Sequence, residues 1–187
     1  MDYEYNYNNA RSRYYNACSE ISSCQGRLSE LNEQKQNRIS TINQLKADIK
    51  KTQAALDDVE QTINSEETLR EKNSVVADKT NQAAVNFIDM VRSDNVTSKS
   101  LTDVYSDEAS KTTTALNDIF SMIKNKKTEL INKIADLQNQ LSRAEADLQD
   151  INNQIRSTES DLQSWSNTQR SASYDMEYYR RKMQEAV

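Results

Sequence analysis

Apolar residues recur at alternating intervals of four and three over two long stretches of this sequence, from Tyr3 to Ile63 and from Leu116 to Met183. Typical runs are Ile42, Leu45, Ile49, Thr52, Leu56 and Val59 in the first stretch, and Leu130, Ile134, Leu137, Leu141, Ala144 and Leu148 in the second. A seven-residue repeat sustained over many turns is the pattern of a coiled coil. The chain is therefore expected to be all-α, with its apolar residues buried along a seam between helices.

Composition supports long helices, because the chain contains no proline and a single glycine, Gly26. Almost nothing therefore forces a turn. Disorder is the alternative, since the aliphatic content is low. The net charge is only −5, however, and the apolar residues are phased, which is not typical of disordered chains.

The one polar, turn-rich stretch, RSDNVTSKS over residues 92–100, lies near the midpoint of the chain. It predicts an antiparallel helical hairpin, with one arm over 3–91, a turn at 92–100 and a second arm over 101–185. Ser100 followed by Asp103 resembles a helix start. The prediction is a single elongated domain over 1–187 that is able to dimerise into a bundle. A parallel dimer of one continuous helix is the chief rival, because heptads alone do not set orientation.

The region 64–115 is less regular than either heptad stretch. Leu69, Val76 and Ala83 continue a helical stripe, but about three residues out of phase with the frame that ends at Ile63. Such a shift is a stammer. Whether this region is a continuous helix or a separate tip bundle stays open from the sequence.

A fully apolar patch lies within this region, and its neighbouring residues cannot all face one helix. A tip mini-core or another chain must then cover part of it. This patch is a candidate partner-binding surface, and it consists of Phe87, Ile88, Met90 and Val91.

Charges beside the seam predict the register of the hairpin, because flanking charges set alignment in coiled coils. One register brings opposite charges together, whereas a shift of one heptad brings Glu20 against an aspartate. The predicted pairs are Arg13 with Asp175, Arg27 with Asp161, and Glu60 with Lys124.

Lys35 and Arg38 occupy core positions, opposite the region of Asp147 and Asp150. One interpretation is a polar layer that fixes the register, with the long stems covering apolar surface and the charged heads reaching the acids. The other is a contact site for carboxylates of a partner.

Catalytic chemistry is poorly supported by this sequence. It contains no histidine, which removes the commonest general base and metal ligand, and one glycine cannot supply a phosphate-binding loop. We expect no enzymatic activity, no metal and no cofactor. Cys18 and Cys24 lie about 9 Å apart along a helix, too far for a mutual disulfide. Free thiols suggest a reducing compartment, and a dimer linked through Cys18 is the alternative.

Most of the nine tyrosines lie near one end of the chain or the other, and a hairpin brings these ends together. Those on the seam are expected to form a zipped aromatic terminus. Those off the seam are candidate partner-binding residues, because exposed aromatics are enriched in interfaces. The off-seam residues are Tyr5, Tyr15, Tyr174 and Tyr178. Capping of the helix ends, or higher-order helix packing, is the alternative for them.

No apolar run approaches the roughly 20 residues of a membrane span, and the N-terminus lacks the features of a signal peptide. The acidic, mixed charge argues against nucleic acid as a partner. These features predict a cytoplasmic protein, with export without a cleavable signal as the alternative. A peripheral membrane scaffold is disfavoured, because no Lys/Arg face dominates.

The stretch from Asp107 to Ile155, DEASKTTTALNDIFSMIKNKKTELINKIADLQNQLSRAEADLQDINNQI, resembles the second helix of small helical-hairpin proteins that accompany LXG toxins in type VII secretion systems of Gram-positive bacteria. The resemblance implies a targeting factor or chaperone that pairs with the N-terminal helical domain of a toxin. The function expected is thus a non-catalytic coiled-coil interaction protein with a helical partner. The alternative is a structural rod or spacer in a homo-oligomeric assembly.

Overall fold

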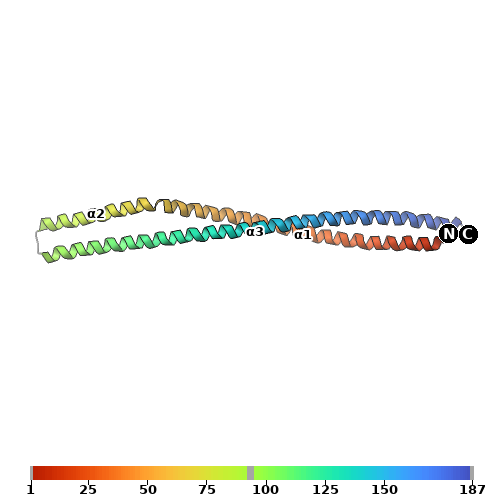
Figure 1. Cartoon of the computed structure of the whole chain (residues 1–187), viewed down its shortest axis with the longest axis horizontal. Coiled ribbons are helices and arrows are strands. Elements are labelled where there is room, and N and C mark those ends of the chain that lie inside the picture. The colour runs from red at the N-terminus through yellow and green to blue at the C-terminus, as the bar shows by residue number, and fades with distance from the viewer. Residues whose placement is uncertain (1, 92–94, 186–187) are drawn as a thin grey trace. The chain divides into compact units, whose positions relative to one another are not determined.

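The computed structural model describes the backbone of residues 2–91 and 95–185; within these ranges the side chains of 81, 84, 87–91, 95–102 and 105 are not described. It contains helices α1 (Tyr3–Asn64), α2 (Glu66–Val91) and α3 (Asn95–Glu185) (Figure 1). The fold is the predicted all-α antiparallel hairpin, with α1 and α2 in one arm and α3 in the other.

The first helix begins with a side-chain cap. The Asp2 carboxylate accepts a hydrogen bond from the Tyr5 backbone N–H at 2.9 Å. Aspartate is among the preferred residues for this role, because it satisfies an N–H that has no partner within the helix.

The first arm is interrupted at Ser65, close to the predicted change of phase. The Ser65 N–H donates to the carbonyls of both Gln61 and Thr62 at 3.2 Å, and the Ser65 carbonyl accepts from the Leu69 N–H at 3.1 Å. The backbone bonds continue on both sides, and the half-buried residues Ile63, Glu66, Asn73, Ala77 and Thr80 keep the heptad frame of the first stretch. The predicted stammer is therefore wrong.

The second arm begins earlier than expected, which corrects the predicted turn. Residues 95–100 lie within α3, as do Ser100 and Asp103, the expected helix start. No proline or glycine stands in this stretch to stop a helix from extending. Residues 92–94 of the predicted turn lie outside the described residues.

Two compact units divide the chain. The terminal unit comprises Met1–Lys46 with Asn139–Val187, and the central unit comprises Ala47–Gln138. In each unit α3 runs antiparallel to the helical arm beside it (Figure 1). The single domain over 1–187 stays a prediction.

The seam of the terminal unit consists of buried and half-buried residues. Leu31, Ile151 and Ile155 form a buried cluster, with Leu28 packed against it. Towards the chain ends the seam becomes alanine-rich, and small residues let two helices approach closely. Its fully buried members there are Ala10, Ala17 and Ala172.

The central unit buries its apolar residues unevenly. Thr52 and Leu56 of α1 are buried, as are Phe120 and Ile134 of α3. None of the described side chains of α2 is buried. The seam between α2 and α3 must therefore consist of small or partly exposed residues.

Candidate functional site

The four candidate tyrosines are all exposed in the terminal unit, with 55% to 68% of their surface accessible. Tyr5 and Tyr15 belong to α1, and Tyr174 and Tyr178 belong to α3. Tyr174 and Tyr178 are four residues apart, so they share one face of their helix. Their exposure agrees with the predicted off-seam position, and their binding role stays a prediction.

Two of these tyrosines are held by neighbouring rings. Tyr15 lies edge-to-face with Tyr14, with ring centroids 5.7 Å apart, and Tyr178 lies edge-to-face with Tyr179 at 5.2 Å. The Arg11 guanidinium lies 5.7 Å from the centre of the Tyr15 ring. Among the described side chains no ring contact joins a candidate tyrosine of α1 to one of α3. The structure thus arranges them around the end of the terminal unit, without gathering them into one cluster.

The second predicted patch, Phe87, Ile88, Met90 and Val91, lies in α2, but its side chains are outside the described residues. Its partner-binding role stays a prediction.

Ion pairs in the terminal unit agree in part with the predicted register. Arg13 donates to the Asp175 carboxylate at 2.6 Å, as the register requires. Arg27 and Asp161 are both exposed, and no ion pair joins them among the described side chains. Exposed charges gain little free energy by pairing, so nothing holds Arg27 and Asp161 together.

The predicted polar layer is half formed. Arg38 is partly buried and its guanidinium lies 3.1 Å from the Asp147 carboxylate, as expected. Lys35 is also partly buried, but within the described residues it forms no ion pair. One side chain of the layer therefore reaches its acid, and the other covers the seam.

The third predicted pair is wrong by one helical turn. Glu60 pairs with Lys127 at 2.9 Å, whereas Lys124 pairs with Glu66 at 2.8 Å. Glu66 lies on the seam three residues after Ile63, and it takes the lysine that was assigned to Glu60.

Glu66 is the most strongly tied charge at this junction. Its carboxylate also contacts the Arg70 guanidinium at 2.7 Å, and its side chain is only 15% exposed. Hydrogen bonds from Lys124 and then Arg70 lower the pKa of Glu66 below its ordinary value of 4.5. Arg70 further donates to Asn117 at 2.7 Å and lies over the Phe120 ring. These contacts set the phase in which α2 meets α3.

That phase overturns the predicted stripe of Leu69, Val76 and Ala83, because all three are exposed. The side chains of α2 that face α3 are instead Asn73, Ala77 and Thr80, which are half-buried. The apolar stripe lies immediately beside the seam.

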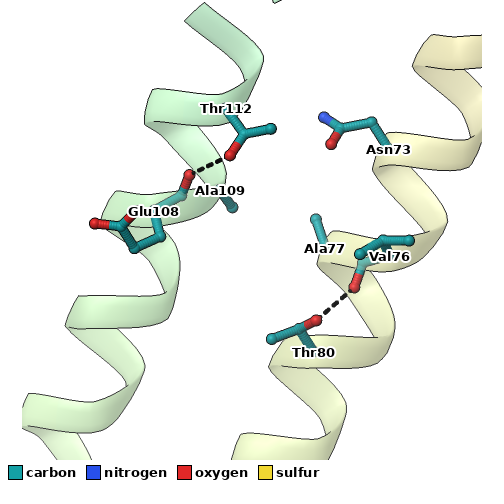
Figure 2. Close-up of a pocket in the computed structure, with 7 residues that line it drawn as sticks. All are labelled: Asn73, Val76, Ala77, Thr80, Glu108, Ala109 and Thr112. Carbon is teal, nitrogen blue, oxygen red and sulfur yellow. Dashed lines mark hydrogen bonds between the residues drawn. The ribbon is translucent and has the colours of Figure 1, made fainter. Parts of the chain in front are cut away.

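A cavity between α2 and α3 shows how small the side chains of this seam are (Figure 2). Ala77 and Ala109 point into the space between the helices. The Thr80 and Thr112 hydroxyls do not bridge it, since each donates to a carbonyl four residues earlier in its own helix. The contact between the helices here lacks large apolar side chains.

The large apolar side chains lie on one side of this cavity, and sequence reasoning did not identify them as a surface. Val76 lines the cavity together with Glu108 and Thr112. Leu69 lies one heptad before Val76, and Ile119 lies one heptad after Thr112, so these positions share a side of the helix pair. We call the following residues the aliphatic face: Leu69, Val76, Ile119 and Met122.

The aliphatic face is strongly exposed, between 45% for Leu69 and 71% for Met122. A signal for it exists in the sequence, because Ala115, Ile119 and Met122 form a second stripe, one residue ahead of the seam. A pattern with two adjacent stripes indicates a helix with a wide apolar surface.

Both cysteines are free and half-buried. The Cys18 sulfur accepts a hydrogen bond from the Gln169 side chain at 3.1 Å, so Cys18 contributes a polar contact beside the seam.

Within the described residues we find no group of three or more acidic or cysteine side chains placed to hold a metal ion. The same residues include no helical stretch with the length and apolar character that crossing a membrane requires.

No protein-family model, curated protein sequence or solved structure matches this chain.

Proposed function

We propose that this chain is a non-catalytic coiled-coil interaction protein that binds a helical protein through the exposed tyrosines of its terminal unit. One observation carries the proposal. The terminal unit closes its seam with Ala10, Ala17 and Ala172, yet it leaves Tyr174 and Tyr178 on one open face of α3. These side chains are not required for the packing of the two helices.

Tyrosine at such a position suits protein recognition. Its ring offers a large contact area at low conformational cost, and its hydroxyl tolerates water before binding. A hollow lined by Tyr7, Ser173, Met176, Glu177 and Arg180 opens between the two helices in the same region. An apolar side chain of a partner helix fits between Tyr7 and Met176.

The resemblance to LXG-toxin accessory proteins suggests the kind of partner. We propose the N-terminal helical domain of a secreted toxin, with the present chain as its targeting factor or chaperone. In this complex a helix of the partner packs against the terminal unit. The complex forms in the cytoplasm, before export.

The test uses the full chain with Tyr5, Tyr15, Tyr174 and Tyr178 all changed to serine. Helicity and melting temperature should stay close to wild type, because the four side chains are exposed. Affinity for a toxin helical domain encoded beside its gene, measured by isothermal titration calorimetry, should fall at least about tenfold, as expected for interface tyrosines.

Tyr14→Ser is the matched control, because Tyr14 is half-buried on the seam. It should lower the melting temperature. If the four-tyrosine variant unfolds as well, these residues belong to the core. If it binds the domain as tightly as wild type, the tyrosine surface is not the binding site.

A structural spacer in a homo-oligomer is the second candidate function. The aliphatic face of the central unit favours it, since this surface is distinct from the tyrosines and needs its own cover.

A further inference from the structure

The aliphatic face leaves the central unit with exposed apolar surface next to a thin seam. Ala77 and Ala109 line the cavity at the seam, while Val76 and Ile119 are strongly exposed. Apolar residues that extend beyond one seam are typical of helices that pack in a bundle of more than two.

We propose that a second copy of this chain covers the aliphatic face. Its α2 lies on α3 of the first copy, and its α3 lies on α2, so that the two central units form an antiparallel four-helix bundle. The twofold axis runs parallel to the helices. This inference goes beyond the proposed binding of a toxin domain and does not depend on the tyrosines.

The proposed twofold axis brings together apolar residues that lie at the same height along the helices. Arg70 contacts Asn117 and Phe120 within one chain, so Leu69 lies level with Ile119. Rotation about an axis parallel to the helices leaves every height unchanged. Leu69 of one copy therefore meets Ile119 of the second copy, and the same contact forms twice.

Charges on the rim of the face are complementary in this arrangement. Thr80 and Glu108 line the same cavity, which places Lys79 and Glu108 at similar heights. Lys79 is exposed, and within the described residues it has no ion pair in its own chain. In the dimer it faces Glu108 of the second copy, whose carboxylate also pairs with Lys111 of its own helix at 3.1 Å. By symmetry this contact forms twice.

A second copy also suits the packing direction. Each helix of the bundle then has antiparallel neighbours on both sides, as in up-and-down four-helix bundles. The side chains at the α2–α3 seam are small, so the larger residues of the aliphatic face can form the centre of the bundle.

The first test measures the oligomeric state of the full chain by sedimentation equilibrium, with Ile119→Asp as the variant and Ile131→Asp as its control. Both isoleucines lie on α3 and have similar exposure, 51% and 46%. They are twelve residues apart, so they point about 120° away from each other.

Wild type and Ile131→Asp should dimerise alike, while Ile119→Asp should weaken the dimer by roughly 30-fold, the size of an interface hot spot. Circular dichroism should show both variants folded. A wild-type protein that stays monomeric at every concentration, or equal losses in both variants, would overturn the proposal. If the wild-type chain stays monomeric and instead forms a one-to-one complex with an added toxin domain that Ile119→Asp weakens, the face belongs to that partner.

The second test measures orientation with two single-cysteine variants, Leu69→Cys and Ile119→Cys, in a chain whose Cys18 and Cys24 are serine. A mixture of the two should form an interchain disulfide on mild oxidation, and neither variant alone should do so efficiently. Cross-linking of Leu69→Cys with itself would place α2 on α2 and overturn the proposed axis.

A charge swap completes the experiment. Lys79→Glu should weaken the dimer several-fold, and Glu108→Lys in the same chain should restore most of the loss, because coupled charges show non-additive effects. If the double variant is weaker than either single variant, Lys79 and Glu108 do not meet across the interface.

Discussion

The terminal and central units are both antiparallel helix pairs, but they differ in how completely they bury their apolar residues. In the terminal unit Leu31, Ile151 and Ile155 are buried, and among its described residues the large apolar side chains left exposed are all tyrosines. In the central unit the exposed set is aliphatic. It consists of Leu69, Val75, Val76, Val85, Val104, Ile119, Met122 and Ile131 among the described side chains.

The difference shows what a two-helix seam can bury. One stripe per helix is enough for a helix pair, and the terminal unit follows this rule closely. The central unit carries a second stripe next to the seam, which a single neighbouring helix cannot reach. The same hairpin is therefore complete in one unit and open in the other.

The largest contrast should appear when the same substitution is made in the two units. Leu31→Ala removes a side chain that is 4% exposed, whereas Leu69→Ala removes one that is 45% exposed. We expect Leu31→Ala to cost about 2 to 4 kcal/mol of unfolding free energy, and Leu69→Ala less than about 1 kcal/mol. Urea unfolding of dilute protein, followed by circular dichroism, measures both. Equal costs would mean that the two units are equally closed.

A smaller contrast concerns the effect of low pH on Glu66 at the start of α2. Since Lys124 and Arg70 lower the pKa of Glu66, its contribution to stability is present above its ordinary pKa. That contribution is lost as the pH falls through the lowered pKa of the folded state. Glu66→Gln should therefore destabilise the protein at neutral pH and have little effect in strong acid.

Glu67→Gln is the control, because Glu67 is exposed and without an ion pair among the described residues. Thermal unfolding across a pH series compares the two variants. The same pH dependence in both would indicate that the pairing of Glu66 contributes nothing specific.

The smallest contrast lies within the terminal unit. Arg13 has an ion pair with Asp175 and Arg27 has none with Asp161. Arg13→Ala should cost less than about 1 kcal/mol, as exposed pairs do, and Arg27→Ala should fall within about 0.5 kcal/mol of zero. Chemical denaturation of both variants checks this order. A larger loss for Arg27→Ala would show that the register differs from the one described.

Much of the fold follows from the spacing of apolar residues. The heptads predict α1 and α3, and the charges beside them predict both the antiparallel orientation and the Arg13–Asp175 pair. These features are local or depend on a repeat that many residues share. The predicted shift of phase after Ile63 is wrong, because the seam keeps its heptad spacing across the interruption at Ser65.

The phase of α2 was predicted wrongly, although α2 continues the heptad frame of α1. Leu69 and Val76 are more apolar than Asn73 and Thr80, so hydrophobicity alone assigns the wrong stripe to the seam. The polar contacts of Glu66 and its neighbours decide the phase, and they depend on residues of α3 that are far away in the sequence.

Of the two candidate surfaces, the tyrosines were predicted from the sequence and the aliphatic face was not. The off-seam position of the four tyrosines follows from the heptad frame, because that frame is regular around them. The aliphatic face escaped prediction since its two halves come from different helices, and they join only once the phase of α2 is known.

The most direct test of the contrast is hydrogen–deuterium exchange of the wild-type chain at increasing protein concentration. We predict that peptides covering 69–80 and 108–122 exchange quickly in dilute protein and gain protection as the chains associate. Peptides around Leu31 and Ile151 should be protected at every concentration. Strong protection of both units in dilute protein, with no change on concentration, would contradict the claim that the terminal unit is closed and the central unit is open.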